Sequence, residues 1–133
     1  MAKPYYEFFC PVKVIAGNAA IEHIPFELAT LGAKRPLIIT DKGVRTNGLL
    51  APIEAAFSTT DTVIGAIFDD VPPDSSLEVV RLAAELYRKK KCDAIIAIGG
   101  GSVIDTSKAT NILVSEGGDD LLQYSGAHNL PKP

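Results

Sequence analysis

The chain has 133 residues, of which 47% are hydrophobic and 22% charged, the length and composition of one globular domain. Its net charge of −3 excludes an electrostatic basis for binding nucleic acid or an anionic membrane. No apolar run approaches the ~20 residues of a membrane span, the N-terminus lacks a secretion signal, and the distant Cys10 and Cys92 predict no disulfide, so we expect a reduced, cytoplasmic protein.

Short apolar runs alternate along the chain with segments of helical spacing. In chain order we expect a strand at Val12–Ala16 closed by Gly17 and Asn18, a helix at Ala19–Leu31 ending before Gly32, a strand at Leu37–Thr40, a helix at Thr46–Phe57, a strand at Thr62–Phe68, a helix at Ser75–Lys91, a strand at Ala94–Ile98 and a helix at Ser102–Ser115. Four successive strand–helix units predict parallel strands joined by crossover helices. Because the strand runs are apolar throughout, we expect an α/β fold with a doubly wound, mostly parallel sheet and helices on both faces.

The organisation along the chain favours a single unit. No Pro/Gly-rich linker and no internal repeat divides residues 1–133, so we expect one domain. After Gly117 the pattern decays into a polar tail, residues 117–133, which looks like a chain interrupted in a loop. The basic run Arg88-Lys89-Lys90-Lys91 is expected at the end of a helix, where cations offset the negative end of the helix dipole.

The most informative stretch is a glycine turn between the strand Ala94–Ile98 and the helix that follows it. Gly99, Gly100 and Gly101 have no side chain, so a ligand can come close to the backbone there. The N-terminus of the next helix offers N–H groups and a positive dipole end, which suits a phosphate. Ser102 and Asp105 also match the S-x-x-[DE] capping box, which would start a helix whether or not a ligand binds.

This turn is not the common dinucleotide fingerprint. Gly99 and Gly101 fit the first two places of G-x-G-x-x-G, but Ile104 stands where the third glycine belongs. The turn also follows the fourth expected strand rather than the first. We interpret it as a different solution to the same problem of holding a phosphate.

Acidic residues follow two other expected strands, at the edge where open α/β sheets bind ligands. Asp41 follows Leu37–Thr40 and could accept hydrogen bonds from a ribose, or could form only the turn with its neighbours. The residues alone leave both roles open. The loop of residues 69–76 follows the next strand on the same edge, and Asp74 or Ser75 is expected to cap the helix after it.

Taken together, these residues resemble the iron-containing alcohol dehydrogenases. The run from Gly99 to Lys108 matches the family signature GGGSxxDxxK at every specified place. Residues 37–41 match the family's lIvTD strand, and residues 11–17 are similar to its first strand and glycine turn. Residues 71–76 stand where many members have V-x-P-N-P-T, with Asp74 in place of the usual Asn. The resemblance covers nearly the whole chain in the right order.

The resemblance implies the family's Rossmann-like nucleotide-binding domain, with NAD as cofactor and NADP less expected. It implies that Gly99, Gly100, Gly101 and Ser102 hold the pyrophosphate. It implies that Asp41 bonds the adenosine ribose and disfavours a 2′-phosphate. The resemblance also places Asp74 at the cofactor site, without assigning it a particular contact, and Asp105 near the nicotinamide side of the cleft.

The family's metal chemistry is not expected in this chain. In the family an all-helical second domain holds Fe²⁺ or another divalent metal through one Asp and three His, and the metal polarises the alcohol for hydride transfer to the nicotinamide. We expect that domain to be absent from residues 1–133, and the only histidines, His23 and His128, lack ligand spacing, so we expect no catalytic and no metal-binding residues.

Two further expectations concern partners. The resemblance implies a homodimer formed through the N-terminal segment, where four aromatic residues cluster: Tyr5, Tyr6, Phe8 and Phe9. The alternative function is a non-catalytic, flavodoxin-like regulatory or association domain. A phosphoacceptor of that kind is not favoured, because Gly17 and Asn18 rather than acidic residues follow the first expected strand and Lys108 lies inside a helix.

Overall fold

The structure, a computed structural model, describes residues 5–126 and 129–130. Its centre is a parallel sheet in which β1 (Pro36–Thr40) lies between β2 (Ala66–Phe68) and β3 (Ala94–Ile98). The order β2-β1-β3 requires a crossover between each strand and the next. The parallel sheet expected from the sequence is confirmed.

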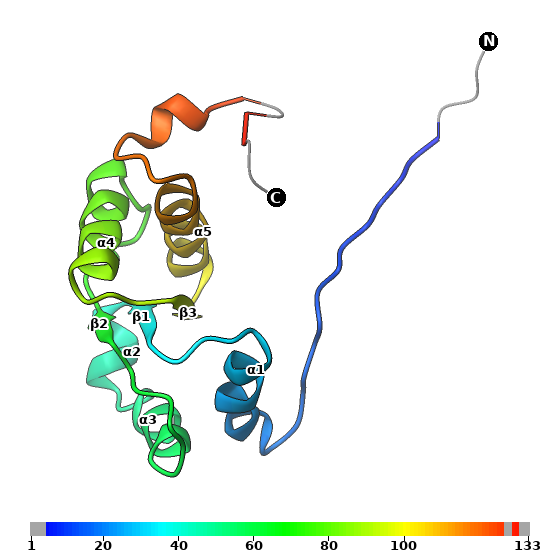
Figure 1. Cartoon of the computed structure of the whole chain (residues 1–133), viewed down its shortest axis with the longest axis vertical. Coiled ribbons are helices and arrows are strands. Elements are labelled where there is room, and N and C mark those ends of the chain that lie inside the picture. Colours follow the sequence, from blue (N-terminus) through cyan, green and yellow to red (C-terminus); the bar gives the residue numbers. More distant parts are fainter. Residues whose placement is uncertain (1–4, 127–128, 131–133) are drawn as a thin grey trace.

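Helices cover both faces of this sheet, as predicted (Figure 1). The helical elements are η1 (Ala20–His23), α1 (Ile24–Thr30), α2 (Lys42–Thr46), α3 (Ala51–Phe57), α4 (Leu77–Lys89), α5 (Gly101–Glu116) and η2 (Leu121–Tyr124). In Figure 1, α4 and α5 lie on one side of the sheet, and α1 and α3 lie on the other. Strand β1 is therefore buried over its whole length.

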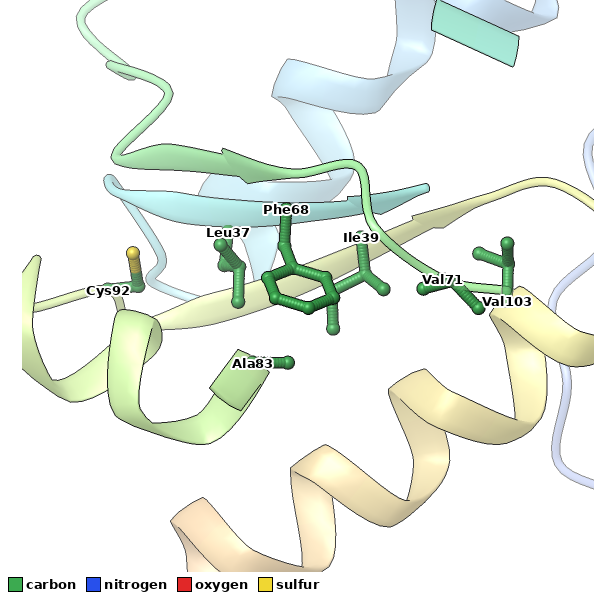
Figure 2. Close-up of a cluster of buried hydrophobic side chains, with 7 residues drawn as sticks. All are labelled: Leu37, Ile39, Phe68, Val71, Ala83, Cys92 and Val103. Atoms are coloured by element: carbon green, nitrogen blue, oxygen red, sulfur yellow. The ribbon is translucent and has the colours of Figure 1, made fainter. Parts of the chain in front are cut away.

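Alternate residues of β1 supply the two halves of the core. Leu37 and Ile39 point toward α4 and α5, where they pack with Phe68, Ala83 and Val103 (Figure 2). Ile38 faces the other way and packs with residues of α1 and α3: Leu28, Ile53 and Phe57. A continuous run of apolar residues is what a strand buried on both faces requires.

The first expected strand is wrong. Residues 12–16 form no strand, and Val12 and Val14 are 66% and 81% exposed. Figure 1 shows the N-terminal segment running away from the body of the domain. A strand exists only by hydrogen bonding to a neighbour, and residues 12–16 pair with none of the described strands.

Two other boundaries differ from prediction. The helix expected at Thr46–Phe57 begins only at Ala51, as α3, because Gly48 adopts a φ of +71° before it and Pro52 lies in its first turn. The short helix α2, which ends at Thr46, was not expected. The strand expected at Thr62–Phe68 is reduced to Ala66–Phe68, which is the part that pairs with β1. The other helices agree with prediction within a few residues at each end.

The start of the polar tail is ordered against the domain. Leu121 and Tyr124 of η2 pack against the cluster of Val80, Ala84 and Leu113. Arg88 at the end of α4 donates to the carbonyls of Leu113 and Gly118, at 3.0 and 2.6 Å, and so ties the C-terminal ends of α4 and α5 together. This contact is more specific than the general dipole role expected for the basic run. None of the described helices has the length and apolar character needed to cross a membrane.

Candidate functional site

The candidate site lies at the carboxyl ends of β1 and β3. The two strands run in register, with Thr40 opposite Ile98. The hydroxyl of Thr40 donates to the carbonyl of Ile98 at 2.7 Å and is fully buried. This register brings Asp41 and Gly99, the residues that follow the two strands, next to each other.

The three glycines of the turn differ in what a side chain would meet at each position. Gly99 has a φ of +153°, and a Cβ there would lie 2.7 Å from Cγ2 of Val103, so the fold itself excludes a larger residue. At Gly100 and Gly101 a Cβ would meet nothing within 4 Å. Packing therefore does not explain the second and third glycines. The open space over them is what a ligand approaching the backbone would occupy.

Helix α5 begins in this turn and presents an uncapped N-terminus. Its N-cap is Gly100, which contributes no side-chain hydrogen bond. The helix runs for 16 residues to Glu116. The N–H groups of its first turn and the positive end of its dipole are directed at the open space, which is an arrangement suited to an anion.

The capping box predicted for Ser102 and Asp105 is wrong, because α5 starts one residue earlier and Ser102 lies inside it. The hydroxyl of Ser102 instead accepts a hydrogen bond of 3.2 Å from the backbone nitrogen of Asp74. Next to it, the hydroxyl of Thr106 contacts that of Ser75 at 2.5 Å. The loop after β2 is thus fastened to the first turns of α5.

Asp74 and Ser75 do not cap α4 as expected. The cap is Ser76, whose hydroxyl accepts from the nitrogen of Val79 at 3.3 Å. Asp74 has a φ of +55°, a left-handed conformation that Asn and Asp adopt more readily than other residues with a side chain. An Asp at this position is therefore compatible with the turn that the loop makes.

Asp41 fills the local role that the sequence left open and has a second carboxylate oxygen that this role does not use. It is the N-cap of α2, and its Oδ1 accepts from the nitrogen of Val44 at 2.8 Å. Its Oδ2 lies 3.4 Å from the position that a Cβ on Gly99 would occupy. One carboxylate oxygen is therefore committed to the helix, while the other faces the glycine turn.

A pocket of about 560 Å³ joins these features. Its lining comes from the turn after β1, the loop after β2 and the glycine turn: Asp41, Lys42, Gly43, Asp69, Asp70, Val71, Pro72, Pro73, Gly100, Gly101, Ser102 and Val103. Of the seven residues predicted for the site, Asp41, Gly100, Gly101 and Ser102 line this pocket. Gly99 shapes the turn beneath it, and Asp74 adjoins it through Ser102.

Asp105 is not brought to this pocket. It is exposed on the second turn of α5 and is absent from the lining. Three charged residues that were not predicted for the site, Lys42, Asp69 and Asp70, do line it. Their positions directly after β1 and β2 were the available signal, since the carboxyl ends of parallel strands share one edge.

Two ion pairs connect α2 to the loop after β2. Lys42 Nζ lies 2.9 Å from Asp70 Oδ1, and Arg45 Nη1 lies 2.7 Å from Asp69 Oδ2. The hydrogen bond and the charge of Asp70 raise the pKa of Lys42 above its ordinary value. Both cations of α2 are therefore already matched by a carboxylate at the rim of the pocket.

The described residues contain no cluster of three or more His, Cys, Asp and Glu side chains that could hold a metal ion. His23 is exposed at the end of η1. His128, the other residue considered in the sequence, lies outside the described residues.

A larger pocket, of about 830 Å³, lies at the opposite edge of the sheet. Residues that precede β1 and β2, among them Lys34 and Thr62, line it together with side chains of α1 and α3. Open α/β sheets bind ligands at the carboxyl ends of their strands. We therefore place the candidate site at the glycine turn, although its pocket is the smaller one.

Comparison with known proteins agrees with the sequence resemblance. A family model described as iron-containing alcohol dehydrogenase matches residues 11–133. The choline dehydrogenase of Bacillus subtilis (strain 168) is 31% identical over 92% of this chain and 30% of its own length. The NAD-dependent methanol dehydrogenase of Bacillus methanolicus is 31% identical over 95% of this chain and 32% of its own length.

A solved structure extends this similarity to the fold. The alcohol dehydrogenase from Oenococcus oeni superposes with a TM-score of 0.84 at 31% identity, covering 97% of this chain and 34% of that protein. The chain thus spans about a third of the length of the relatives that it matches.

Proposed function

The chain belongs to the iron-containing alcohol dehydrogenase family, and from this membership we propose that it is the domain of such an enzyme that binds the nicotinamide cofactor. In the proposal, residues 1–133 form one dinucleotide-binding unit. The complete enzyme transfers hydride between an alcohol and the cofactor.

The observation that carries the proposal is the open space over Gly100 and Gly101 at the N-terminus of α5. No packing contact accounts for these glycines, because a Cβ at either position would meet nothing within 4 Å. A pyrophosphate seated there would accept hydrogen bonds from the first turn of α5 and lie at the positive end of its dipole. The structure therefore fits the group that the family implies.

Individual residues have stated roles in this proposal. Gly99 shapes the turn, Gly100 and Gly101 admit the pyrophosphate, and Ser102 donates its hydroxyl hydrogen to a phosphate oxygen. That hydrogen is available because the Ser102 oxygen accepts from Asp74. Asp74 acts through its backbone, and we assign no contact to its carboxylate. Asp105 remains proposed at the nicotinamide side, outside the pocket that the other residues line.

The preferred cofactor in the proposal is NAD rather than NADP. Asp41 faces the glycine turn with one carboxylate oxygen, which can accept hydrogen bonds from the hydroxyls of the adenosine ribose. The same charge would repel a 2′-phosphate. One relative, the methanol dehydrogenase of Bacillus methanolicus, is named as NAD-dependent, which supports this choice.

When bound, the nicotinamide supplies the hydride acceptor. This chain binds and orients the cofactor, and it contributes no metal ligand and no catalytic residue. A homodimer formed through the N-terminal segment is also part of the proposal, because Tyr5, Tyr6, Phe8 and Phe9 are all more than 80% exposed.

The test is calorimetric titration of the chain with NAD, and with ADP as the part of NAD that the pocket would hold. We expect both to bind at one site with comparable, modest affinity. A chain that binds neither at millimolar concentration would instead fit the alternative, a regulatory or association domain without a nucleotide.

A further inference from the structure

The two ion pairs at the rim of the pocket bear on which nicotinamide cofactor the site accepts. An NADP site needs a cation close to the 2′-phosphate. The cations nearest to Asp41 along the chain are Lys42 and Arg45, both on α2, the helix that Asp41 caps. Each of them would be a natural partner for a phosphate on the neighbouring ribose.

Both cations are engaged elsewhere. Asp70 holds Lys42 at 2.9 Å, and Asp69 holds Arg45 at 2.7 Å. Asp69 and Asp70 follow β2 directly, so the adjacent strand supplies the counter-charges. Lys42, Asp69 and Asp70 line the same pocket as Asp41 and Gly100. Three carboxylates thus face two cations at the ribose end of the site, which leaves it negative overall.

Resting on the proposed binding of a nicotinamide dinucleotide, we propose that Asp70 and Asp69 are specificity-determining residues that exclude NADP by pairing with Lys42 and Arg45. Asp41 repels the 2′-phosphate directly. Asp70 and Asp69 act in addition, because they cancel the charges that would otherwise offset that repulsion. The preference for NAD over NADP then depends on residues that follow both β1 and β2, and not on Asp41 alone.

The size of the effect follows from the exposure of the pairs. The side chain of Lys42 is 75% exposed and that of Asp70 is 62% exposed, so water and salt screen their charges strongly. A unit charge about 7 Å from a phosphate in such surroundings changes its affinity roughly fivefold. The effect should be largest at low ionic strength.

The experiment measures the dissociation constants of NAD and NADP by calorimetry at low salt for four forms of the chain. In Asp70→Asn, Lys42 is released, and the ratio of the NADP constant to the NAD constant should fall about fivefold. In Lys42→Gln that ratio should rise. Asp61→Asn is the matched control, since it removes one negative charge at the opposite edge of the sheet and should leave the ratio unchanged.

The outcomes distinguish a failure of this specificity role from a failure of the proposed cofactor binding. If the parent binds NAD but Asp70→Asn and Asp61→Asn give the same ratio as the parent, the specificity role is wrong while cofactor binding stands. An equal fall of the ratio in both variants would mean that only total charge matters, which also overturns the proposal. If the parent binds neither NAD nor ADP, the proposed function fails and this inference fails with it.

Discussion

The backbone nitrogen of Asp74 donates a hydrogen bond of 3.2 Å to the hydroxyl of Ser102, which joins the loop after β2 to the first turn of α5. The two residues are 28 positions apart in the chain. A second contact, between Thr106 and Ser75, lies beside it at 2.5 Å. The loop and the start of α5 are therefore fastened together where both line the candidate site, and Ser102 makes one of the two contacts between them.

Replacement of this hydroxyl should affect binding more than stability. In Ser102→Ala the backbone N–H of Asp74 loses its acceptor. Because Asp74 is exposed, water can replace that acceptor, so we expect a loss of less than about 1 kcal/mol in the free energy of unfolding. Loss of the hydrogen bond to a charged phosphate should weaken the binding of NAD about tenfold, or ~1.4 kcal/mol. Denaturant melts and calorimetry measure the two quantities. Ser58→Ala is the control, because it removes a serine hydroxyl that donates to the carbonyl of Ala55 at the end of α3, away from the site. An equal loss of NAD affinity in Ser58→Ala would refute the role of Ser102.

The charge of Asp41 can be separated from its role as a helix cap. Asn caps a helix about as well as Asp, so Asp41→Asn should retain the bond to Val44 while it narrows the preference for NAD over NADP. Asp41→Gly should narrow the preference as well, at a cost of a few tenths of a kcal/mol in stability. The affinities for both cofactors are the measurement. Asp120→Asn, at the cap of η2, is the matched control, and an unchanged cofactor ratio in Asp41→Asn would leave Asp41 as a turn residue only.

Much of the fold could be predicted because its signals are local. The unbroken apolar run of residues 37–40 specifies a strand buried on both faces, and Leu37 and Ile38 do pack against opposite helical layers. The glycine turn and the helix after it were predicted in the same way. The late start of α3, after Gly48, was missed although Gly48 and Pro52 were both visible, because the apolar spacing of the helix extends back through the turn.

Other features depended on distant parts of the chain. Residues 12–16 have the composition of a strand, but composition cannot supply the neighbouring edge with which a strand must pair. Ser102 fits a capping box, yet its hydroxyl is used by Asp74, whose approach depends on the path of the whole loop. The pairing of Lys42 with Asp70 likewise required the two strand ends to be placed side by side.

The N-terminal segment should mediate self-association. Tyr6 and Phe8 are 95% and 90% exposed in an extended stretch, and apolar surface of this kind is costly to leave in water. We expect the parent chain to associate at high concentration in light scattering and a chain without residues 1–10 to remain monomeric. Phe26→Ala, which removes an exposed aromatic side chain on α1, should associate like the parent. A parent that stays monomeric at every concentration would contradict this prediction.

The chain by itself should hold no catalytic metal and oxidise no alcohol. A catalytic metal needs about three protein ligands around an open position, and the described residues offer no group of three. Without a Lewis acid, nothing stabilises the alkoxide that develops on the alcohol. The measurements are metal analysis after dialysis and an assay of NADH formation from short alcohols with added iron or zinc. Tightly held stoichiometric metal, or metal-dependent turnover that survives purification, would contradict the assignment of the chemistry to another part of the enzyme.

The central claim, that the glycine turn binds the pyrophosphate of NAD, is tested most directly by calorimetric titration of Gly100→Val. A Cβ at Gly100 meets no protein atom within 4 Å, so the substitution fills the space proposed for the phosphate without a clash of that atom with the fold. Ala55→Val also introduces a valine, on the exposed side of α3 away from the glycine turn, and serves as the control. We predict that NAD affinity falls well beyond tenfold, a loss of more than ~1.4 kcal/mol, in Gly100→Val and not in Ala55→Val. Equal NAD affinity for the parent and a folded Gly100→Val would contradict the claim.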